Sequence, residues 1–277
     1  MRLPETNPDH VEGINSSRSS GLGEFVKLAM GLGLAAAVVT ATLVVAIGWV
    51  APWIPFAWEE SIAGPVDPVE SPVDPEAQTA LRELAHKLAE AGDLPQGVTI
   101  RVHLSDQATP NAFATLGGHV VVTRGLIEAV SSENALAMVV AHEIAHIARR
   151  HPIQALGRAV VLQLAWAALA GATGQGAVEQ VLGRAGLLTV LRFNREMERA
   201  ADRAALMTLE RHYGHVGGAA EFFRTLQARD GTGAWADFLR THPRPADRLE
   251  AIERRSRDKK TPPAPLPSPL AALGQDG

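Results

Sequence analysis

The stretch ENALAMVVAHEIAHIARR, residues 133–150, is the part of the sequence from which the rest is best interpreted. Apolar residues surround HEIAH, and Ser131 and Ser132 before it are typical N-cap residues, so the stretch predicts a largely buried helix. We expect this helix to stop at His151, because a residue before proline is pushed out of the α region. Helical residues four apart lie about 40° apart around the axis, so His142 and His146 present both imidazoles to one point. Glu143 lies on the adjoining flank.

This spacing is typical of a zinc metalloprotease, in which two histidines bind the metal and the glutamate activates water. The chain has no cysteine, so any metal must be held by histidine and carboxylate. The alternative is a pair of core histidines that are hydrogen-bonded without a metal.

A catalytic zinc also needs a third protein ligand and an open position. A metzincin site is excluded, because Arg149 and Pro152 stand where that pattern requires Gly and His. The second site helix is predicted further along the chain, within residues 187–212, where an apolar stripe contains two carboxylates. Its members are Leu187, Leu191, Asn194, Glu198, Ala201, Asp202, Ala205 and Leu209. We predict Glu198 as the third ligand and Asp202, one turn on, as the residue that orients a ligand histidine. The alternative for these carboxylates is a buried salt bridge to an arginine.

The flanking sequence predicts an α+β fold that is mostly helical. A first amphipathic helix carries Leu81, Leu84, Ala85 and Leu88 at helical spacing and ends at Gly92. Residues 98–104 alternate like a strand, and residues 111–123 contain two strands joined around two glycines. After residue 125 the pattern is helical almost throughout, which indicates a small sheet laid against several helices.

Several of these motifs together resemble a known family. HEIAH followed by NREMERAAD is similar to the gluzincins that include HtpX and the zinc-dependent CAAX prenyl protease of type one, whose second motif is E-x-x-x-D. The resemblance extends to NAFA at residues 111–114, to GGHVVVTRGLI at 117–127 and to THPRPADRL at 241–249. It covers residues 76–255, which we predict to be a zincin-like metallopeptidase domain with one Zn²⁺ per chain.

The resemblance implies further roles for residues outside the two helices. A strand with Asn111, Ala112 and Phe113 would border the cleft and pair with an extended substrate. His242 would approach the metal as a catalytic residue, and would either stabilise the oxyanion or occupy the water position. From its own surroundings, His242 also fits a turn residue before Pro243.

The remaining histidines lack partners at ligand spacing. His151 is predicted to be a structural residue at a helix end, off the metal-binding face, where a cation suits the helix dipole. The default for the others is a surface or hairpin position; they are His86, His103, His119, His212 and His215.

Residues 28–50 are uncharged and long enough to cross a bilayer core of about 30 Å, so we predict a transmembrane helix after an N-terminal tail, residues 1–27. A cleaved signal peptide is the main alternative, but the apolar run is longer than a signal core and no clean A-x-A site follows. Arg18 and Lys27 precede the span, which places the N-terminus in the cytoplasm. Residues 159–178 are also uncharged, and we expect a helix that packs on the domain or rests on lipid.

Two segments are predicted to lie outside the packed domain. Residues 59–75 are acidic and rich in proline, which favours an extended linker. Residues 256–277 carry TPPAPLPSP and little periodicity, which favours a disordered tail.

Composition and resemblance together lead to a functional prediction. With 26 basic and 30 acidic side chains, the chain lacks the positive field that nucleic acid binding needs. We predict a membrane-anchored endopeptidase for unfolded or misassembled proteins near the lipid bilayer, like envelope quality-control relatives. It would be a single-pass protein of the bacterial inner membrane, with its protease domain in the periplasm. The alternative is a non-catalytic chaperone or assembly factor that binds extended segments with the same fold.

Overall fold

The central element of the fold is helix α5, Glu133–Ala148, in which every residue from Asn134 to Ile147 is buried. Ser132 caps it by accepting a hydrogen bond from the backbone N–H of Ala135, as the sequence predicts. A helix buried all round must pack against other elements on every side, so α5 organises the domain around itself.

The computed structural model describes residues 21–64, 74–171, 176, 193–228, 238, 242, 246–256 and 261–274. The other elements are helices α1 (Gly21–Val50), α2 (Phe56–Ala63), α3 (Pro75–Ala91), α4 (Arg124–Glu128), α6 (His151–Leu169), α9 (Arg195–Tyr213), α10 (Glu221–Ala228), α12 (Ala246–Ser256) and α13 (Ser268–Ala272), the single turns η1 (Ala51–Trp53) and η2 (Leu116–Gly118), and strands β1 (Arg101–Ser105), β2 (Ala112–Ala114) and β3 (His119–Thr123). Several predictions therefore fall on residues outside the described part, namely most of the tail 1–27, residues 65–73 of the linker, and Leu187 and Leu191 of the inward stripe.

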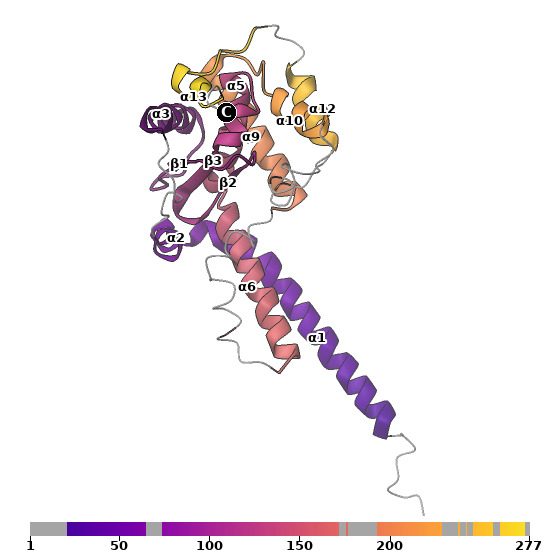
Figure 1. The fold of residues 1–277 in the computed structure, drawn as a ribbon. Helices are drawn as coiled ribbons and strands as arrows, with labels where there is room; N and C mark the ends of the chain where they lie inside the picture. The colour runs from indigo at the N-terminus through magenta and orange to yellow at the C-terminus, as the bar shows by residue number, and fades with distance from the viewer. Residues whose placement is uncertain are drawn as a thin grey trace, which may run out of the picture.

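The sheet is small and lies beside α5 (Figure 1). Its order is β1-β3-β2, with β1 parallel to β3 and β2 antiparallel to β3. The turn between β2 and β3 contains Gly117 and Gly118, both with positive φ, and a Cβ on Gly118 would lie 1.9 Å from the carbonyl oxygen of Thr99. The predicted pair of strands joined at two glycines is confirmed. A side chain at Gly118 would collide with the backbone, so this position requires glycine.

Helix α9 packs along α5 and carries the second half of the site. Asn194 caps it by accepting hydrogen bonds from the N–H groups of Glu196 and Met197, and Gly214 ends it in the left-handed conformation. Its buried face contains Glu198, Ala201, Asp202, Ala205 and Leu209. The described part of the predicted inward stripe is thus buried beyond its cap, and the α+β prediction is confirmed.

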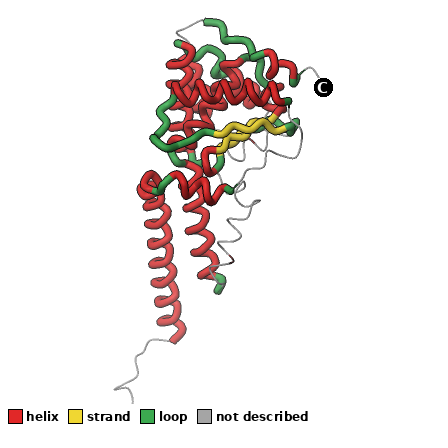
Figure 2. Tube along the Cα trace, turned by 90° about the vertical axis from the view of Figure 1, so that its left-hand side faces the viewer, coloured by secondary structure: helices red, strands yellow, loops and turns green. Residues whose placement is uncertain are grey.

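Helices α1 and α6 project together from the domain (Figure 2). No residue of α1 is buried, and the helix is long and apolar enough to cross a membrane; α6 passes the same test. The two helices touch where a Cβ on Gly157 would lie 3.1 Å from Ile47. Beyond that contact α6 exposes Leu162, Trp166 and Leu169, so its apolar half is not packed on the domain. Of residues 159–178, Ala159 and Val160 pack against the domain beside Leu116, whereas the large apolar side chains from Leu162 to Leu169 are exposed.

The prediction of an extended linker over residues 59–75 is wrong at its start. Helix α2 includes Glu59–Ala63, and Glu59 is 1% exposed because its carboxylate pairs with the guanidinium of Arg150. Acidic composition alone indicated solvent exposure, but a carboxylate is buried readily when a cation meets it.

The prediction of a disordered tail over residues 256–277 is also wrong for residues 261–274. This segment pairs with the start of α5, where Ala264 accepts from the N–H of Glu133 and donates to the side chain of Asn134. Leu270 in α13 is fully buried in the main core. Proline-rich sequence does not prevent packing when its few apolar side chains find a groove.

Candidate metal centre

Helix α5 brings two imidazoles together, as its sequence predicts. The Nε2 atoms of His142 and His146 lie 3.0 Å apart, and both side chains are buried. Glu198 reaches the same point from α9: its Oε1 lies 3.3 Å from Nε2 of His146, and its Oε2 lies 3.5 Å from Nε2 of His142. The two helices thus converge on one point, as the sequence predicts.

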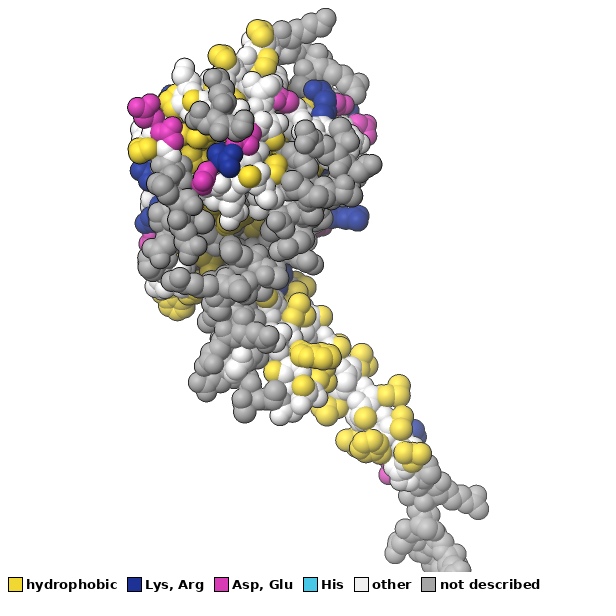
Figure 3. Space-filling view, in the orientation of Figure 1, with side chains coloured by type: hydrophobic (Ala, Val, Ile, Leu, Met, Phe, Trp, Pro, Cys, Tyr) yellow, Lys and Arg dark blue, Asp and Glu magenta, His cyan; other side chains and the backbone are white. Residues whose placement is uncertain are grey.

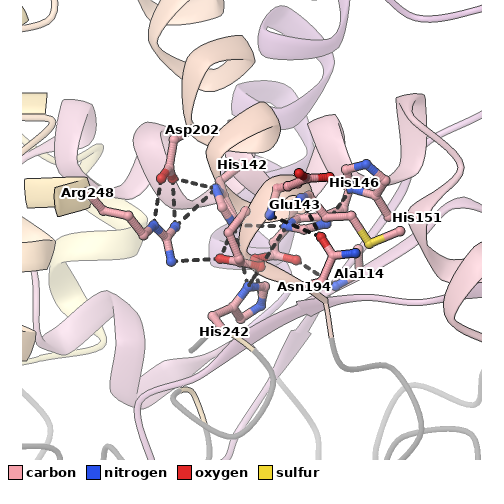
Figure 4. A network of polar contacts seen from close by, with 12 residues as sticks. Ala114, His142, Glu143, His146, His151, Asn194, Asp202, His242 and Arg248 are labelled. Atoms are coloured by element: carbon pink, nitrogen blue, oxygen red, sulfur yellow. Dashed lines mark hydrogen bonds and ion pairs between the residues drawn. The ribbon is translucent and has the colours of Figure 1, made fainter. Parts of the chain in front are cut away.

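His242 completes this group from the C-terminal part of the chain (Figure 4). Its Nδ1 lies 3.0 Å from Oε1 of Glu198 and 3.4 Å from Nε2 of His142. The four ligand atoms all lie within 4.8 Å of one another, and all four residues are buried. We call His142, His146, Glu198 and His242 the metal cluster.

The outward nitrogens of the two α5 histidines show that the cluster suits a cation. Nδ1 of His142 lies 3.0 Å from Oδ1 of Asp202, and Nδ1 of His146 lies 2.9 Å from Nδ1 of His151. A proton on each of these outward atoms leaves both Nε2 lone pairs directed at the centre, which is how protein ligands for a metal are oriented. Two nitrogen lone pairs and a carboxylate facing each other in a dry interior repel, and a divalent cation resolves that repulsion.

Glu143 lies beside the metal cluster and is itself fully buried. Its Oε2 accepts a hydrogen bond from the backbone N–H of Ala114 at 2.8 Å, and its Oε1 lies 3.3 Å from Nε2 of His242. Burial raises the pKa of Glu143 above its usual range, although the facing histidines oppose this. A carboxylate with a raised pKa is suited to accept a proton and give it back near neutral pH.

Within the described sheet β2 is an edge strand, and its outer side faces Glu143. Asn111 and Thr115 hydrogen-bond to β3 through their backbone groups, so the alternate residues Ala112 and Ala114 direct theirs away from β3. The N–H of Ala114 is the group that reaches Glu143. The predicted substrate-binding residues Asn111, Ala112 and Phe113 therefore lie on a strand that borders the candidate site.

Comparison of the sequence with models of protein families identifies the family of this chain. The model of peptidase family M48 matches residues 75–256. The chain belongs to peptidase family M48. The resemblance inferred from HEIAH and the second motif is thereby confirmed.

Individual M48 relatives match shorter or longer parts of the chain. The mitochondrial metalloendopeptidase OMA1 of Schizosaccharomyces pombe is 34% identical over 155 residues, which is 55% of this chain and 45% of the relative. The putative beta-barrel assembly-enhancing protease of Vibrio cholerae is 30% identical over 209 residues, 70% of this chain and 41% of the relative. The beta-barrel assembly-enhancing protease of Escherichia coli K12 is 32% identical over 164 residues, 53% of this chain and 32% of the relative. The chain spans less than half the length of these relatives.

Arg248 is a site residue that sequence reasoning missed in this M48 chain. Its guanidinium donates to both oxygens of Asp202 at 2.6 Å and lies 2.6 Å from Oε2 of Glu198. The salt bridge that was the alternative for the two carboxylates thus exists beside the metal cluster, and the two arrangements are compatible. The sequence signal for Arg248 is its place in the THPRPADRL motif. The structure shows that it is buried, and a buried cation needs carboxylate partners.

His151 lies outside the four residues of the metal cluster, as the sequence predicts, but its predicted place at a helix C-terminus is wrong. It begins α6, is 5% exposed and contacts the outer nitrogen of His146. Burial beside an imidazole favours the neutral ring. The helix breaks after Ala148, where Arg150 adopts the left-handed conformation, and this turn places His151 at the start of α6 beside His146.

The charges around the metal cluster favour a positive centre. Burial alone would raise the pKa of Glu198, but His242 and hydrogen bonds from the other histidines outweigh it and hold this pKa far below the usual range. Burial alone would lower the pKa of His142, but Asp202 and Glu198 outweigh it and raise this pKa to about 9. The carboxylates of α9 therefore stabilise positive charge at the point where the four ligand atoms meet.

Proposed function

We propose that this chain is a membrane-anchored, zinc-dependent endopeptidase that cleaves unfolded or misassembled proteins near the membrane. The observation that supports it most is the convergence of the metal cluster and Glu143 in a buried site next to the free edge of β2. Two neutral imidazoles and a carboxylate form a ligand set of the kind found in catalytic zinc sites.

The proposal gives each residue a role. His142, His146 and Glu198 hold the ion, and Asp202 and His151 orient the two histidines from behind. When bound, a zinc ion polarises a peptide carbonyl and lowers the pKa of water. Glu143 takes the proton of the attacking water and returns it to the leaving amine. His242, whose ring lies between Glu143 and Glu198, stabilises the negative oxygen that develops on the carbonyl or holds the water position at rest.

The substrate class follows from backbone geometry. A free strand edge pairs with an extended chain through main-chain hydrogen bonds, which select for unfolded conformation more than for sequence. Strand β2 is at the edge of the sheet, and the backbone groups of Ala112 point away from β3, toward the side where such a chain would add. Relatives named as an assembly-enhancing protease and a metalloendopeptidase support a protein substrate.

The membrane component rests on α1. Its 30 residues expose their apolar side chains, as does the projecting part of α6 (Figure 3). Exposed Trp49, Trp53 and Trp58 gather at the domain end of α1, where side chains of this kind anchor at the lipid interface. A bacterial inner membrane location, with the domain on the periplasmic side, completes the proposal.

The test uses the full-length protein in detergent with a reduced and alkylated protein as unfolded substrate. Glu143→Gln should keep bound zinc and lose at least about a hundredfold in cleavage rate, because an amide cannot accept the proton. Glu198→Ala should lose both zinc and cleavage. Glu196→Ala, which changes an exposed residue on the same helix, serves as the control and should behave like wild type.

Three results would contradict the proposal. Wild-type cleavage that resists a zinc chelator excludes metal dependence. Equal cleavage by Glu143→Gln removes its role as the base. Binding of the unfolded substrate with no cleavage at all, in zinc-loaded protein, points to a non-catalytic assembly factor instead.

A further inference from the structure

Arg150 has an unusual backbone conformation next to the metal cluster. Among the described residues other than glycine, it is the one with a positive φ, at 59°. It lies in the short connection between α5 and α6, four residues after His146 and directly before His151. The left-handed region is unfavourable for a residue with a Cβ, so the surroundings must hold Arg150 there.

The groups that hold Arg150 all come from the segment next to α1. Its Nε donates to Oε1 of Glu59 at 2.6 Å, and its Nη2 donates to the carbonyl of Ile54 at 2.8 Å. Its guanidinium also lies over the ring of Phe56, 5.5 Å from the centroid. Residues 54–59 thus form a receptor for this side chain, and both partners of the ion pair are buried.

Glu59 also touches the other half of the site. The backbone of Gly117, in the turn between β2 and β3, lies close enough to this carboxylate to favour its charged form, although burial outweighs this and raises the pKa of Glu59. The same turn is packed closely by α2, since a Cβ on Gly117 would lie 3.1 Å from Ala63. Strand β2 leads into this turn directly after Ala114, whose N–H holds Glu143.

We propose that Glu59 and Arg150 are positioning residues that couple the membrane-proximal segment to the metal cluster. Their ion pair fixes the connection between α5 and α6, and this places His151 so that its Nδ1 meets Nδ1 of His146. Through Gly117, the same carboxylate fixes the strand that holds Glu143. The site is therefore complete only when α2 is seated, and the enzyme's geometry depends on the segment that α1 anchors. This inference rests on the metal-binding role of His146 in the proposed function.

A buried ion pair between Glu59 and Arg150 favours one arrangement of the two segments, because neither charge is tolerated in the interior without the other. Removing one partner leaves an unpaired charge in the interior, which strongly disfavours the arrangement around it. A buried ion pair adds little net stability, so we expect its role to be to fix how the segment with α2 sits against the connection between α5 and α6.

The experiment measures zinc affinity of the metal-free, full-length protein in detergent by competition with a chromophoric chelator. Glu59→Gln should weaken zinc binding about 10–100-fold, the range expected when an outer contact of a ligand histidine is lost. Arg150→Gly should do the same, because glycine accepts the left-handed backbone and removes the side-chain contacts with Glu59, Ile54 and Phe56. The matched control is Glu60→Gln, which breaks the neighbouring, half-exposed pair with Arg101 and should stay within about twofold of wild type.

A double-mutant cycle separates positioning from general destabilisation. If the effect passes through His151, Glu59→Gln should add little to the loss of zinc affinity already caused by His151→Phe. Cobalt(II) loaded into Glu59→Gln should show an altered visible absorption band, because the ligand geometry changes. Arg150→Lys keeps the charge and is the variant to use if Glu59→Gln does not fold; it should lose several-fold in zinc affinity.

The outcomes distinguish this inference from the proposed function. Unchanged zinc affinity in folded Glu59→Gln and Arg150→Gly would overturn the coupling, as would fully additive effects with His151→Phe. Wild-type protein that binds no zinc would instead overturn the proposed function.

Discussion

At the scale of single residues, the buried polar side chains around the metal cluster contact one another in pairs, and neighbouring pairs share a residue. Asp202 contacts His142 and is itself held by Arg248, while His151 contacts His146 and follows Arg150 in the chain. Both α5 histidines of the metal cluster thus have a polar partner on their outer nitrogen, which is the arrangement that keeps the geometry of a metal site. Sequence spacing predicted the ligands on α5 and α9, but of these partners it predicted only Asp202.

His119 gives a residue-scale prediction about pH. It lies at the predicted hairpin position, directly after the turn between β2 and β3, but it is buried there. Its exposed fraction is 9%, and its Nδ1 lies 2.8 Å from Nε2 of His103 on the neighbouring strand. Burial, then the charges of His103 and Arg101, lower the pKa of His119 to about 4. The usual value in an unfolded chain is about 6.5.

The sign follows from which state takes up the proton. Above pH 6.5 His119 is neutral in both states and its contribution to stability is complete; as the pH falls toward 4, only the unfolded chain binds a proton. We expect His119 to lower the free energy of unfolding by on the order of 2 kcal/mol over this range, and the melting temperature to fall with it. His119→Gln should flatten this part of the curve. An identical slope in the variant would assign the acid sensitivity to other groups.

At the scale of elements, α6 is where the chain departs most from an ordinary domain. It begins at the metal site with His151 and ends with exposed Trp166 and Leu169 beside α1. At 1.5 Å per residue, the part beyond Gly157 extends about 18 Å past its contact with Ile47 on α1. If α1 crosses a bilayer, this half of α6 lies within the same bilayer.

Labelling of single cysteines tests that placement directly, because the natural chain contains no cysteine. In full-length protein reconstituted in vesicles, Leu164→Cys and Leu169→Cys should be protected from a water-soluble maleimide and become reactive in detergent. Glu83→Cys, on the exposed face of α3, is the control for a position in water, and should react in vesicles that present the domain outward. Equal labelling rates for residues 83 and 169 in those vesicles would place α6 outside the lipid.

At the scale of the whole molecule, the site depends on contacts between segments that are far apart in sequence. Residues from β2, α5, α6, α9 and α12 meet around the metal cluster. Residues 261–274 pair with the start of α5 (Figure 1). The domain therefore includes segments on both sides of the stretch first predicted, residues 76–255.

Leu270 tests how much the C-terminal segment contributes. It is fully buried, so Leu270→Ala should lower the free energy of unfolding by about 2–5 kcal/mol, through lost burial and the cavity left behind. The measurement is the melting temperature of the metal-free protein. Ser268→Ala, an exposed change in the same helix, should leave it nearly unchanged. If the two variants melt alike, the segment does not stabilise the domain.

The sequence by itself determined what depends on neighbours along the chain. The spacing of His142 and His146 follows from helical geometry, the caps at Ser132 and Asn194 act within one turn, and the inward stripe that contains Glu198 follows from a period of 3.6 residues. Only the tertiary structure decided that Glu59 is buried, that His151 contacts His146 and that Arg248 contacts two carboxylates. The distances between these residues depend on how the helices pack and on where the chain turns between them. No local pattern of side chains encodes those distances.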